Sequence, residues 1–240
     1  MRKDHRPYYV KHLYNEFQKW YAHYYLAPQC EYYGHGLHFM KPWHVEIFGG
    51  PVSLGDYTTV IATPDKKVRF TIWSKDENSG KIAIGKCCLI CPGTRIMSAT
   101  AINIGDGCMM AQSVSISDSD WHGIYDRSQS IGNTAAVNIG HNVWIGDSVL
   151  VGKGVTVGDN AIIGAGAVVL KDIPANAIAG GNPAMVLKYL DPAKPLTTRT
   201  QWLAEPSKLA ADFEIIDRTN MAGNTLAGWF RSMLFPRKGD

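Results

Sequence analysis

The sequence predicts an all-β fold, a parallel β-helix in which short strands coil around one core. The first observation is a strict six-residue period with aliphatic register positions at Ile139, Ile145, Val151, Val157, Ile163 and Val169. The second is the glycine that follows each of the first five, at Gly140, Gly146, Gly152, Gly158 and Gly164. The third is a small or β-branched residue four positions after each, at Val143, Val149, Val155, Ala161, Ala167 and Ile173. A period of six fits neither a helix nor a half-buried strand, so it favours a solenoid.

Each six-residue unit is interpreted as one short strand followed by one corner. Three units make a rung, and successive rungs stack through parallel backbone hydrogen bonds. The aliphatic residue points inward, and glycine lies where the chain turns sharply and a side chain would be costly. Because one rung cannot bury its own inner face, the fold needs several rungs.

The repeat extends toward the N-terminus with interruptions. Faint repeats begin at Ile47, the register loosens over residues 66–80, and it resumes at Ile84, Ile90 and Ile96. After a slip of two residues it continues at Ile104, Met110 and Ile116. The polar stretch between Ile116 and Val137 is too irregular to be another rung. It is expected to be a loop extruded from one corner, and such loops on a rigid scaffold commonly carry function.

Both ends of the chain are predicted to be helical. Residues 7–26 carry apolar and aromatic side chains at three- and four-residue steps, which indicates an amphipathic helix that ends before Pro28 and covers the open end of the solenoid. Residues 203–216 form a second predicted helix. A further apolar stripe follows at Leu226, Trp229, Phe230, Met233 and Leu234. That stripe is expected to pack on the body of the protein or on a neighbouring subunit; contact with a membrane surface is the alternative.

These patterns divide the chain into three parts. Residues 1–45 form an N-terminal helical and irregular cap. Residues 46–190 form the β-helix domain, with a loop insertion over residues 117–137. Residues 191–240 form a C-terminal helical tail.

Composition narrows the class of protein. The chain has 240 residues and a formal net charge of +3, and no run of lysine or arginine indicates a nucleic-acid partner. No apolar run approaches the ~20 residues needed to span a bilayer, and the first residues lack the apolar core of a signal peptide. A cytoplasmic location is therefore the expectation.

The five cysteines invite two other interpretations. An odd number without a secretion signal argues against a disulfide framework. A metal clip at Cys87, Cys88 and Cys91 is an alternative, but Cys88 and Cys108 occupy the small position of the repeat, which favours packing. The histidines before residue 46 lack the spacing of a zinc site. No metal is expected.

The run VWIGDSVLVGKGVTVGDNAIIGAGAVVLKDIPANAIAGGNPAMVLKYL, residues 143–190, resembles the hexapeptide-repeat acyltransferases, in particular the maltose, galactoside and xenobiotic acetyltransferase branch. The resemblance covers roughly residues 46–190. It implies a left-handed β-helix, an exception to the right-handed rule for crossovers. It also implies coenzyme A or acetyl-coenzyme A as acyl donor, a sugar or saccharide precursor as acceptor, and a homotrimer with each active site between two subunits.

The loop Ser117-Asp118-Ser119-Asp120-Trp121-His122-Gly123 is the best candidate catalytic site. Transfer of an acyl group to a hydroxyl or amine needs a base for the acceptor's proton, and histidine suits this near neutral pH. His122 also matches the position of the family's catalytic histidine to within about one residue. Asp118 or Asp120 would orient the imidazole. The alternative is a surface histidine in a polar loop.

The donor site is expected on the later rungs. A pantetheine arm can lie along glycine-rich corners and bond to exposed backbone groups, which requires small residues such as Gly146, Asp147, Gly164, Ala165 and Gly166. The resemblance implies coenzyme A contacts at Asp147 and Ala165, and a further contact pair at Leu170 and Lys171.

The motif Gly181-Asn182-Pro183-Ala184 resembles the family's adenine-end motif, which implies contacts at Asn182 and Pro183. Two basic residues usually follow it, but Met185 stands at the first position and Lys188 at the second. Lys171 and Lys188 are therefore expected to meet the phosphates. Trp144, in the VWIG motif, is expected to line the cleft or else to pack on the loop.

The leading hypothesis is a coenzyme A-dependent O- or N-acyltransferase with acetyl as the favoured acyl group and His122 as general base. A non-catalytic solenoid that acts as a scaffold is the second hypothesis, and the same fold with a formyl or longer acyl donor is the third. The family's polar acceptor contacts have no match, since Ser98, Ala99 and Thr100 stand in their place. His141 is interpreted as a surface or subunit-contact residue without a partner.

Overall fold

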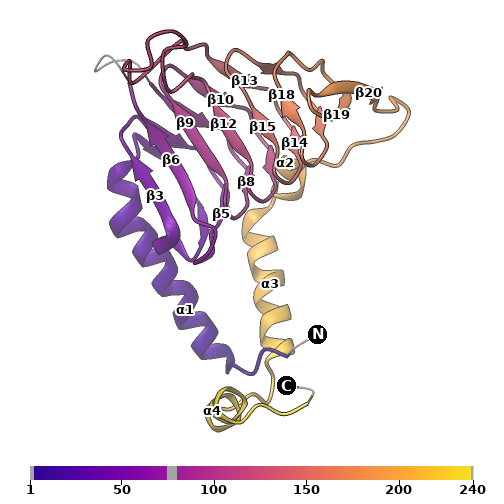
Figure 1. Ribbon diagram of the computed structural model, residues 1–240. Helices are drawn as coiled ribbons and strands as arrows, with labels where there is room; N and C mark the ends of the chain where they lie inside the picture. Colours follow the sequence, from indigo (N-terminus) through magenta and orange to yellow (C-terminus); the bar gives the residue numbers. More distant parts are fainter. Residues whose placement is uncertain (1–2, 75–79, 239) are drawn as a thin grey trace.

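The computed structural model describes residues 3–74, 80–238 and 240, and its body is a three-sided coil of short parallel strands (Figure 1). The predicted fold class, a left-handed parallel β-helix with helical extensions at both ends, is confirmed. Three sheets, here called A, B and C, form its sides.

The sheets follow one another along the chain, so each rung takes one strand from A, then B, then C. Sheet A contains β1 (Tyr32–Tyr33), β4 (Val52–Leu54), β7 (Ile82–Ile84), β10 (Ile102–Ile104), β13 (Val137–Ile139) and β16 (Thr156–Val157). Sheet B contains β2 (His38–Met40), β5 (Thr59–Ile61), β8 (Leu89–Ile90), β11 (Met109–Met110), β14 (Trp144–Ile145), β17 (Ile162–Ile163), β19 (Ala177–Gly180) and β20 (Met185–Tyr189). Sheet C contains β3 (Val45–Phe48), β6 (Val68–Ile72), β9 (Arg95–Ser98), β12 (Ser115–Ser117), β15 (Leu150–Val151) and β18 (Val168–Val169).

Six rungs result, numbered here 1 to 6 from β1–β3 to β16–β18, and a partial seventh contains β19 and the antiparallel β20. The corners that join sheets A and B form the AB edge, those that join B and C form the BC edge, and those that return from C to A form the CA edge. Each residue of the predicted site lies on one of these edges or on the face of one sheet.

The core is the stack of inward side chains that the six-residue period predicts. All six register residues from Ile139 to Val169 are buried, and so are their equivalents Ile84, Ile90, Ile96, Ile104, Met110 and Ile116. Cys88 and Cys108 fill the small position at the AB edge, where their thiols lie 3.2 Å from the Gly105 carbonyl and 3.0 Å from the Gly140 carbonyl. These cysteines therefore pack as small buried side chains.

The solenoid starts earlier than its sequence pattern. β1 and β2 lie inside the predicted cap of residues 1–45, yet they pair in parallel register with β4 and β5. This first rung lacks the repeat because its open end is filled from outside: Ala22 and Leu26, from the N-terminal segment, join Phe39 and Val45 in the core.

The N-terminal helix reaches the core only at its C-terminal end. α1 (Tyr8–Tyr21) continues as a π-helical turn, η1 (Ala22–Leu26), and a 3₁₀ turn, η2 (Ala27–Gln29), so the predicted helix over residues 7–26 is confirmed. Gln18 accepts a hydrogen bond from the Lys41 backbone N–H, 2.6 Å away, just before the 3₁₀ turn η3 (Pro42–His44). The helix is thus docked on rung 1.

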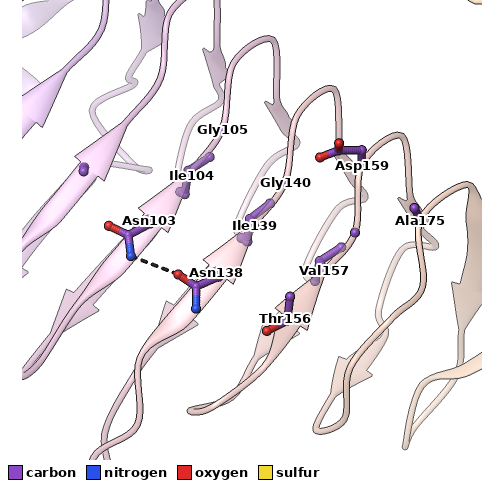
Figure 2. A pocket seen from close by; sticks show the side chains of 12 residues that line it. Asn103, Ile104, Gly105, Asn138, Ile139, Gly140, Thr156, Val157, Asp159 and Ala175 are labelled. Carbon is purple, nitrogen blue, oxygen red and sulfur yellow. Dashed lines mark hydrogen bonds between the residues drawn. The ribbon is translucent and has the colours of Figure 1, made fainter.

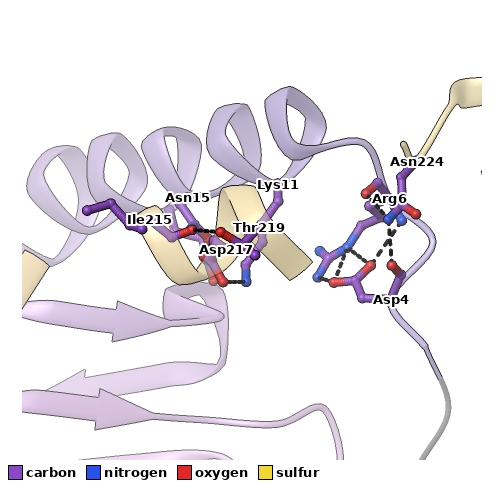
Figure 3. A network of polar contacts seen from close by, with 9 residues as sticks. Asp4, Arg6, Lys11, Asn15, Ile215, Asp217, Thr219 and Asn224 are labelled. Atoms are coloured by element: carbon purple, nitrogen blue, oxygen red, sulfur yellow. Dashed lines mark hydrogen bonds and ion pairs between the residues drawn. The ribbon is translucent and has the colours of Figure 1, made fainter. Parts of the chain in front are cut away.

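The C-terminal tail contains α2 (Arg199–Trp202), α3 (Pro206–Asn220) and α4 (Leu226–Leu234). The Arg199 guanidinium donates to the Cys87 carbonyl at 2.9 Å, which ties the start of the tail to the AB edge. α3 meets the N-terminal segment through an ion pair between Lys11 and Asp217 at 2.7 Å (Figure 3). The Asn224 amide beyond α3 donates to the Arg6 backbone carbonyl.

The apolar stripe of α4 is largely exposed in the single chain. Of its five residues, four are exposed: Leu226, Phe230, Met233 and Leu234. The stripe therefore does not pack mainly on the body of its own chain, and the neighbouring subunit and the membrane surface stay predictions. Within the described residues, no helix combines the length and apolar character needed to cross a bilayer.

Candidate functional site

The loop that carries His122 leaves the CA edge of rung 4 and returns at rung 5. Its base is a short antiparallel pairing: Ser119 bridges Thr134, and the Asp120 N–H donates to the Asn133 carbonyl at 2.9 Å. The Trp121 indole N–H donates to the Ser117 hydroxyl at 3.1 Å. The first limb of the loop is therefore held on the solenoid by its own hydrogen bonds.

Asp118 is fully buried and anchors this loop to the preceding rung. Its carboxylate accepts hydrogen bonds from the Ser98 hydroxyl at 2.7 Å and from the backbone N–H groups of Ala99 at 2.6 Å and Thr100 at 2.9 Å. Residues 98–100 are those that stand where the family's acceptor contacts were expected. The Ser98 hydroxyl and the Ala99 and Thr100 N–H groups hold the loop by donating to Asp118. This geometry gives Asp118 a positioning role.

Asp120 connects the loop to the next rung. One carboxylate oxygen, Oδ1, pairs with the Lys153 ammonium at 2.6 Å, and Lys153 lies on the CA edge of rung 5. The other oxygen, Oδ2, is buried and has no hydrogen-bond partner among the described residues. Asp120 therefore keeps a free acceptor two residues from His122. Lys153 was not singled out from the sequence, because its partner lies 33 residues earlier.

His122 itself is exposed at the surface of the loop. A Cβ added at Gly132 would overlap the His122 backbone carbonyl, so glycine is required where the two limbs of the loop meet. Within the described residues, no hydrogen bond joins His122 to Asp118 or Asp120. The imidazole is thus accessible to a substrate, and its orientation by a carboxylate stays a prediction.

The glycine-rich corners of the predicted donor site stack along the BC edge of rungs 5 to 7. The Gly166 N–H donates to the Asp147 carbonyl at 2.7 Å, and the Val168 N–H to the Gly181 carbonyl at 3.0 Å. A Cβ on Gly146 would lie 2.7 Å from the Ala165 nitrogen, closer than real Cβ contacts. The stacking of corners alone thus demands a small residue at Gly146. The same stacking leaves Asp147, Ala165 and Asn182 exposed along the BC edge.

The other predicted donor residues lie on both sides of this edge. Leu170 and Lys171 occupy the CA edge of rung 6, across sheet C from Ala165. Trp144 is half-exposed on the outer face of sheet B, between Met109 and Ile162 in neighbouring strands. Lys188 lies on β20, opposite Ile178, on the same sheet.

The predicted site residues therefore form two groups in a single chain. One group belongs to the CA edge and contains His122, Asp118, Asp120, Leu170 and Lys171. The other belongs to the BC edge and sheet B and contains Trp144, Gly146, Asp147, Gly164, Ala165, Asn182, Pro183 and Lys188. Sheet C separates the two groups. Crossing it from one edge to the other takes six residues of chain, which span at most ~20 Å.

His141 has the partner that the sequence did not reveal. Its Nδ1 accepts a hydrogen bond from the Asp106 N–H at 3.0 Å, and its own N–H donates to the Asp159 carboxylate at 2.6 Å. Asp56 and Asp106 accept backbone N–H groups of the preceding rung in the same way, at the same AB edge. His141 thus takes the place of an aspartate in a structural ladder, and its partners are 35 and 18 residues away.

A shallow hollow of about 560 Å³ lies away from all these residues, on the outer face of sheet A (Figure 2). The Asn103 amide there donates to the Asn138 side-chain oxygen at 2.9 Å. No residue of the predicted site lines this hollow. The site residues predicted from the sequence thus lie elsewhere, along the edges of sheet C and on sheet B.

Comparison with known proteins identifies the repeat. Residues 136–171 match the family model described as bacterial transferase hexapeptide (six repeats). A polysialic acid O-acetyltransferase of Escherichia coli O1:K1 is 40% identical over 111 residues, which cover 45% of this chain and 36% of that protein. A galactoside O-acetyltransferase of Escherichia coli (strain K12) is 38% identical over 98 residues, 40% of this chain and 48% of that protein. The chain thus spans less than half the length of either curated relative.

Solved structures of the same kind align over a larger share of the chain. A hexapeptide-repeat-containing acetyltransferase from Vibrio cholerae aligns with a TM-score of 0.46 and 24% identity, over 67% of this chain and 74% of that one. A galactoside acetyltransferase in complex with coenzyme A aligns with a TM-score of 0.34 and 25% identity, over 68% of this chain and 64% of that one. The sequence matches confirm the predicted resemblance to hexapeptide-repeat acetyltransferases.

Proposed function

We propose that this chain transfers an acetyl group from acetyl-coenzyme A to a hydroxyl or amine of a saccharide-like acceptor. The observation that carries the proposal is the anchored loop: a rigid solenoid presents an exposed histidine beside the edges of sheet C. Both curated relatives are named O-acetyltransferases of saccharides, which favours O-transfer and a sugar acceptor. One solved neighbour holds coenzyme A and another acetyl-coenzyme A, which supports the donor.

In the proposed mechanism His122 takes the proton of the acceptor hydroxyl as its oxygen attacks the thioester carbonyl. The C–O bond forms, the C–S bond breaks, and the imidazolium returns the proton to the departing thiolate. Asp120, with its free Oδ2, would stabilise the imidazolium after a small rotation of the loop. Exposed backbone N–H groups at glycine corners would stabilise the oxyanion. Lys171 and Lys188 would meet the phosphates of the donor.

The site is proposed to lie between two copies of the chain, in a homotrimer. In one chain His122 and the BC-edge residues are separated by the width of sheet C, so neither group alone is a complete site. If the CA edge of one copy faces the BC edge of the next, the two groups meet. A mixture of His122→Ala and Ala165→Arg chains, each inactive alone, should then regain a fraction of activity, and light scattering should give three chains.

The central test is His122→Ala. Turnover should fall by about a hundredfold or more, because the base is lost, while coenzyme A affinity stays nearly unchanged. Ser130→Ala, an exposed position in the same loop, serves as control and should retain turnover. Near-normal turnover in His122→Ala would sink the assignment of the base.

Donor binding separates this proposal from the scaffold alternative. Calorimetry with acetyl-coenzyme A should give a measurable affinity that Lys188→Glu weakens, and the bound ligand should raise the melting temperature. Absence of binding by both methods would favour a non-catalytic scaffold. Formyl and longer acyl donors are tested in the same titration. The cytoplasmic location stays a prediction.

A further inference from the structure

The BC edge of rung 2 is longer than the same edge elsewhere. Six residues, 62–67, connect β5 to β6, whereas four connect the corresponding strands of each of rungs 3 to 6. The additional residues form a turn closed by two backbone hydrogen bonds between Thr63 and Lys66, of 3.2 and 3.1 Å. Pro64 and Asp65 are its tip, and Lys66 and Lys67 follow. The turn therefore places two consecutive lysines at the BC edge of rung 2.

A pocket of about 410 Å³ lies beside this turn and is lined mainly by charged side chains. Four of its residues are cationic: Lys66, Lys67, Arg69 and Arg95. Asp65 is the one carboxylate among the lining residues that the structure describes. A pocket of this volume is large enough for a small organic ligand. We refer to it as the cationic pocket.

The two arginines of the cationic pocket lie side by side on sheet C. Glu46, Arg69, Arg95 and Ser115 are register partners on four successive parallel strands. Neighbouring strands are ~4.8 Å apart, and like charges at facing positions destabilise a sheet. The juxtaposition of Arg69 and Arg95 thus has a structural cost that a bound anion would remove.

The described residues supply only part of the counter-charge. Glu46 accepts hydrogen bonds from Lys67 and Arg69, both at 2.6 Å, and so neutralises one side of the ladder. Lys66 donates to the Ser113 hydroxyl at 3.2 Å. In residues 3–74, 80–238 and 240, neither Lys66 nor Arg95 forms an ion pair with a carboxylate. Two cations are therefore left to attract an external anion.

The cationic pocket lies along the same BC edge as the predicted donor corners, where the sheet C strands begin. Ser115, the strand partner of Arg95, belongs to β12, which leads directly into the loop of His122. Ser113 lines the pocket and lies in the BC corner of rung 4. Ser148 and Gly166 hold the equivalent positions in the BC corners of rungs 5 and 6. The Ser148 N–H donates to the Gln112 carbonyl, so the corners of rungs 4 and 5 are in contact. The pocket is thus two to three rungs, ~10–15 Å, from the predicted donor corners.

The order of the charges along the solenoid indicates which substrate the pocket faces. The predicted phosphate ligands Lys171 and Lys188 lie on rungs 6 and 7, at the C-terminal end. In the proposed mechanism the thioester lies beside His122, whose loop leaves rung 4, so the donor would extend from rungs 6 and 7 toward rung 4. The cationic pocket lies on rungs 2 to 4, toward the N-terminal end of the solenoid from the expected thioester. The acceptor would approach the thioester from this end.

We propose that the cationic pocket binds an oxyanion of the acceptor, so that the substrate class is an acidic saccharide. Carboxylate and phosphate groups share this chemistry, since each presents paired oxygens to the fork of Arg95 and to the ammonium of Lys66. This inference rests on the proposed function and narrows its acceptor. It does not depend on which residue is the base.

The test measures binding without donor and therefore without turnover. Calorimetry compares an oligomer of sialic acid, a hexose phosphate and a neutral galactoside on the wild-type protein and on Arg95→Gln and Lys66→Gln. Lys81→Gln removes an exposed lysine that does not line the pocket and is the matched control. At least one acidic ligand should bind more tightly than the galactoside. Its Kd should rise about 5–20-fold in each pocket variant and stay unchanged in the control.

Three further measurements make the outcome decisive. Raising the salt concentration should weaken binding of the acidic ligand and not of the galactoside. Arg95→Lys should recover part of the affinity lost in Arg95→Gln, and melting temperatures should show that every variant is folded. The preferred ligand then distinguishes a carboxylate-bearing from a phosphate-bearing saccharide.

Two results would overturn the inference. One is equal affinity of acidic and neutral ligands, or no effect of the pocket variants on acidic ligands. The other is loss of acetyl-coenzyme A affinity in Arg95→Gln without loss of acidic-saccharide affinity, which would assign the pocket to the donor. Acetyl-coenzyme A binding to the wild-type protein is measured in parallel, so a failure of the proposed function is recognised separately.

Discussion

Rungs 5 and 6 and rungs 1 to 4 are built on the same core but present different surfaces. In rungs 5 and 6 most strands have two residues, the BC and AB corners have four, and glycine follows five of the six register residues. In rungs 1 to 4 the sheet C strands have three to five residues, one BC corner has six, and the long loop ends rung 4. The regular half has corners of uniform length, whereas the irregular half adds a longer corner with two lysines and the loop that carries His122.

The proposed donor and acceptor sites fall on different halves of the solenoid. A strict repeat leaves no spare chain, so its edge offers hydrogen-bonding backbone that suits a long, extended donor. Deviations from the repeat add residues at an edge without disturbing the core, because the inward positions stay in register. Side-chain recognition of an acceptor is therefore expected where the repeat is broken.

The largest expected effect is at the junction of the two halves, in Asp118→Ala. The change leaves the Ser98 hydroxyl and the Ala99 and Thr100 N–H groups without their acceptor, and each unsatisfied buried group costs about 1–3 kcal/mol. We expect a loss of about 3 kcal/mol or more in the free energy of unfolding, measured by urea denaturation. Asp118→Asn keeps one oxygen acceptor and should lose less; equal losses in the two variants would contradict the role of the carboxylate.

A smaller effect is expected in the regular half, from Gly146→Ala compared with Gly164→Ala. A Cβ at Gly146 would lie 2.7 Å from the backbone of the next rung, whereas a Cβ at Gly164 would make an ordinary contact at 3.4 Å. Gly146→Ala should therefore cost about 1–3 kcal/mol through overpacking, and Gly164→Ala less than about 0.5 kcal/mol. Similar melting temperatures for both variants would show that the corners are not stacked this closely.

The smallest effect on stability is expected in the irregular half, from Glu46→Gln. Its ion pairs with Lys67 and Arg69 are substantially exposed and contribute less than about 1 kcal/mol. Hydrogen bonds from Lys67 and then Arg69 lower the pKa of the Glu46 carboxyl. A lowered pKa stabilises the folded state fully above the ordinary glutamate pKa of about 4.3. The difference between wild type and variant should therefore shrink below that pH and vanish once the pH has fallen through the lowered pKa of the folded state.

The same variant sharpens the comparison of the two halves. Removing the Glu46 carboxylate leaves Lys67 and Arg69 without their counter-charge, so an acidic saccharide should bind severalfold more tightly. Calorimetry beside the wild-type protein measures this change. Weaker binding in Glu46→Gln would mean that the carboxylate helps to arrange the cations rather than competing with the ligand.

Much of the architecture was predictable because it depends on local repetition. The period from Ile139 to Val169 identified the inward positions, and the break after Ile116 identified the loop. The early start of the coil at Tyr32 was not predictable, because rung 1 is completed by Ala22 and Leu26 from outside the repeat. The role of His141 was missed for a similar reason, since its partners come from other rungs.

The sequence by itself determined the class of fold and the inward positions of the regular rungs, because both follow from spacing along the chain. The candidate base, His122, came from its chemistry and from the family resemblance. Only the tertiary structure decided that Asp118 anchors the loop and that sheet C separates the BC-edge residues of the predicted donor site from the edge that carries His122. It alone brought Lys66 and Arg95 into one pocket. Stacking of rungs places residues 20 or more positions apart within contact distance, and those lateral neighbours are set by the length of every intervening corner and loop.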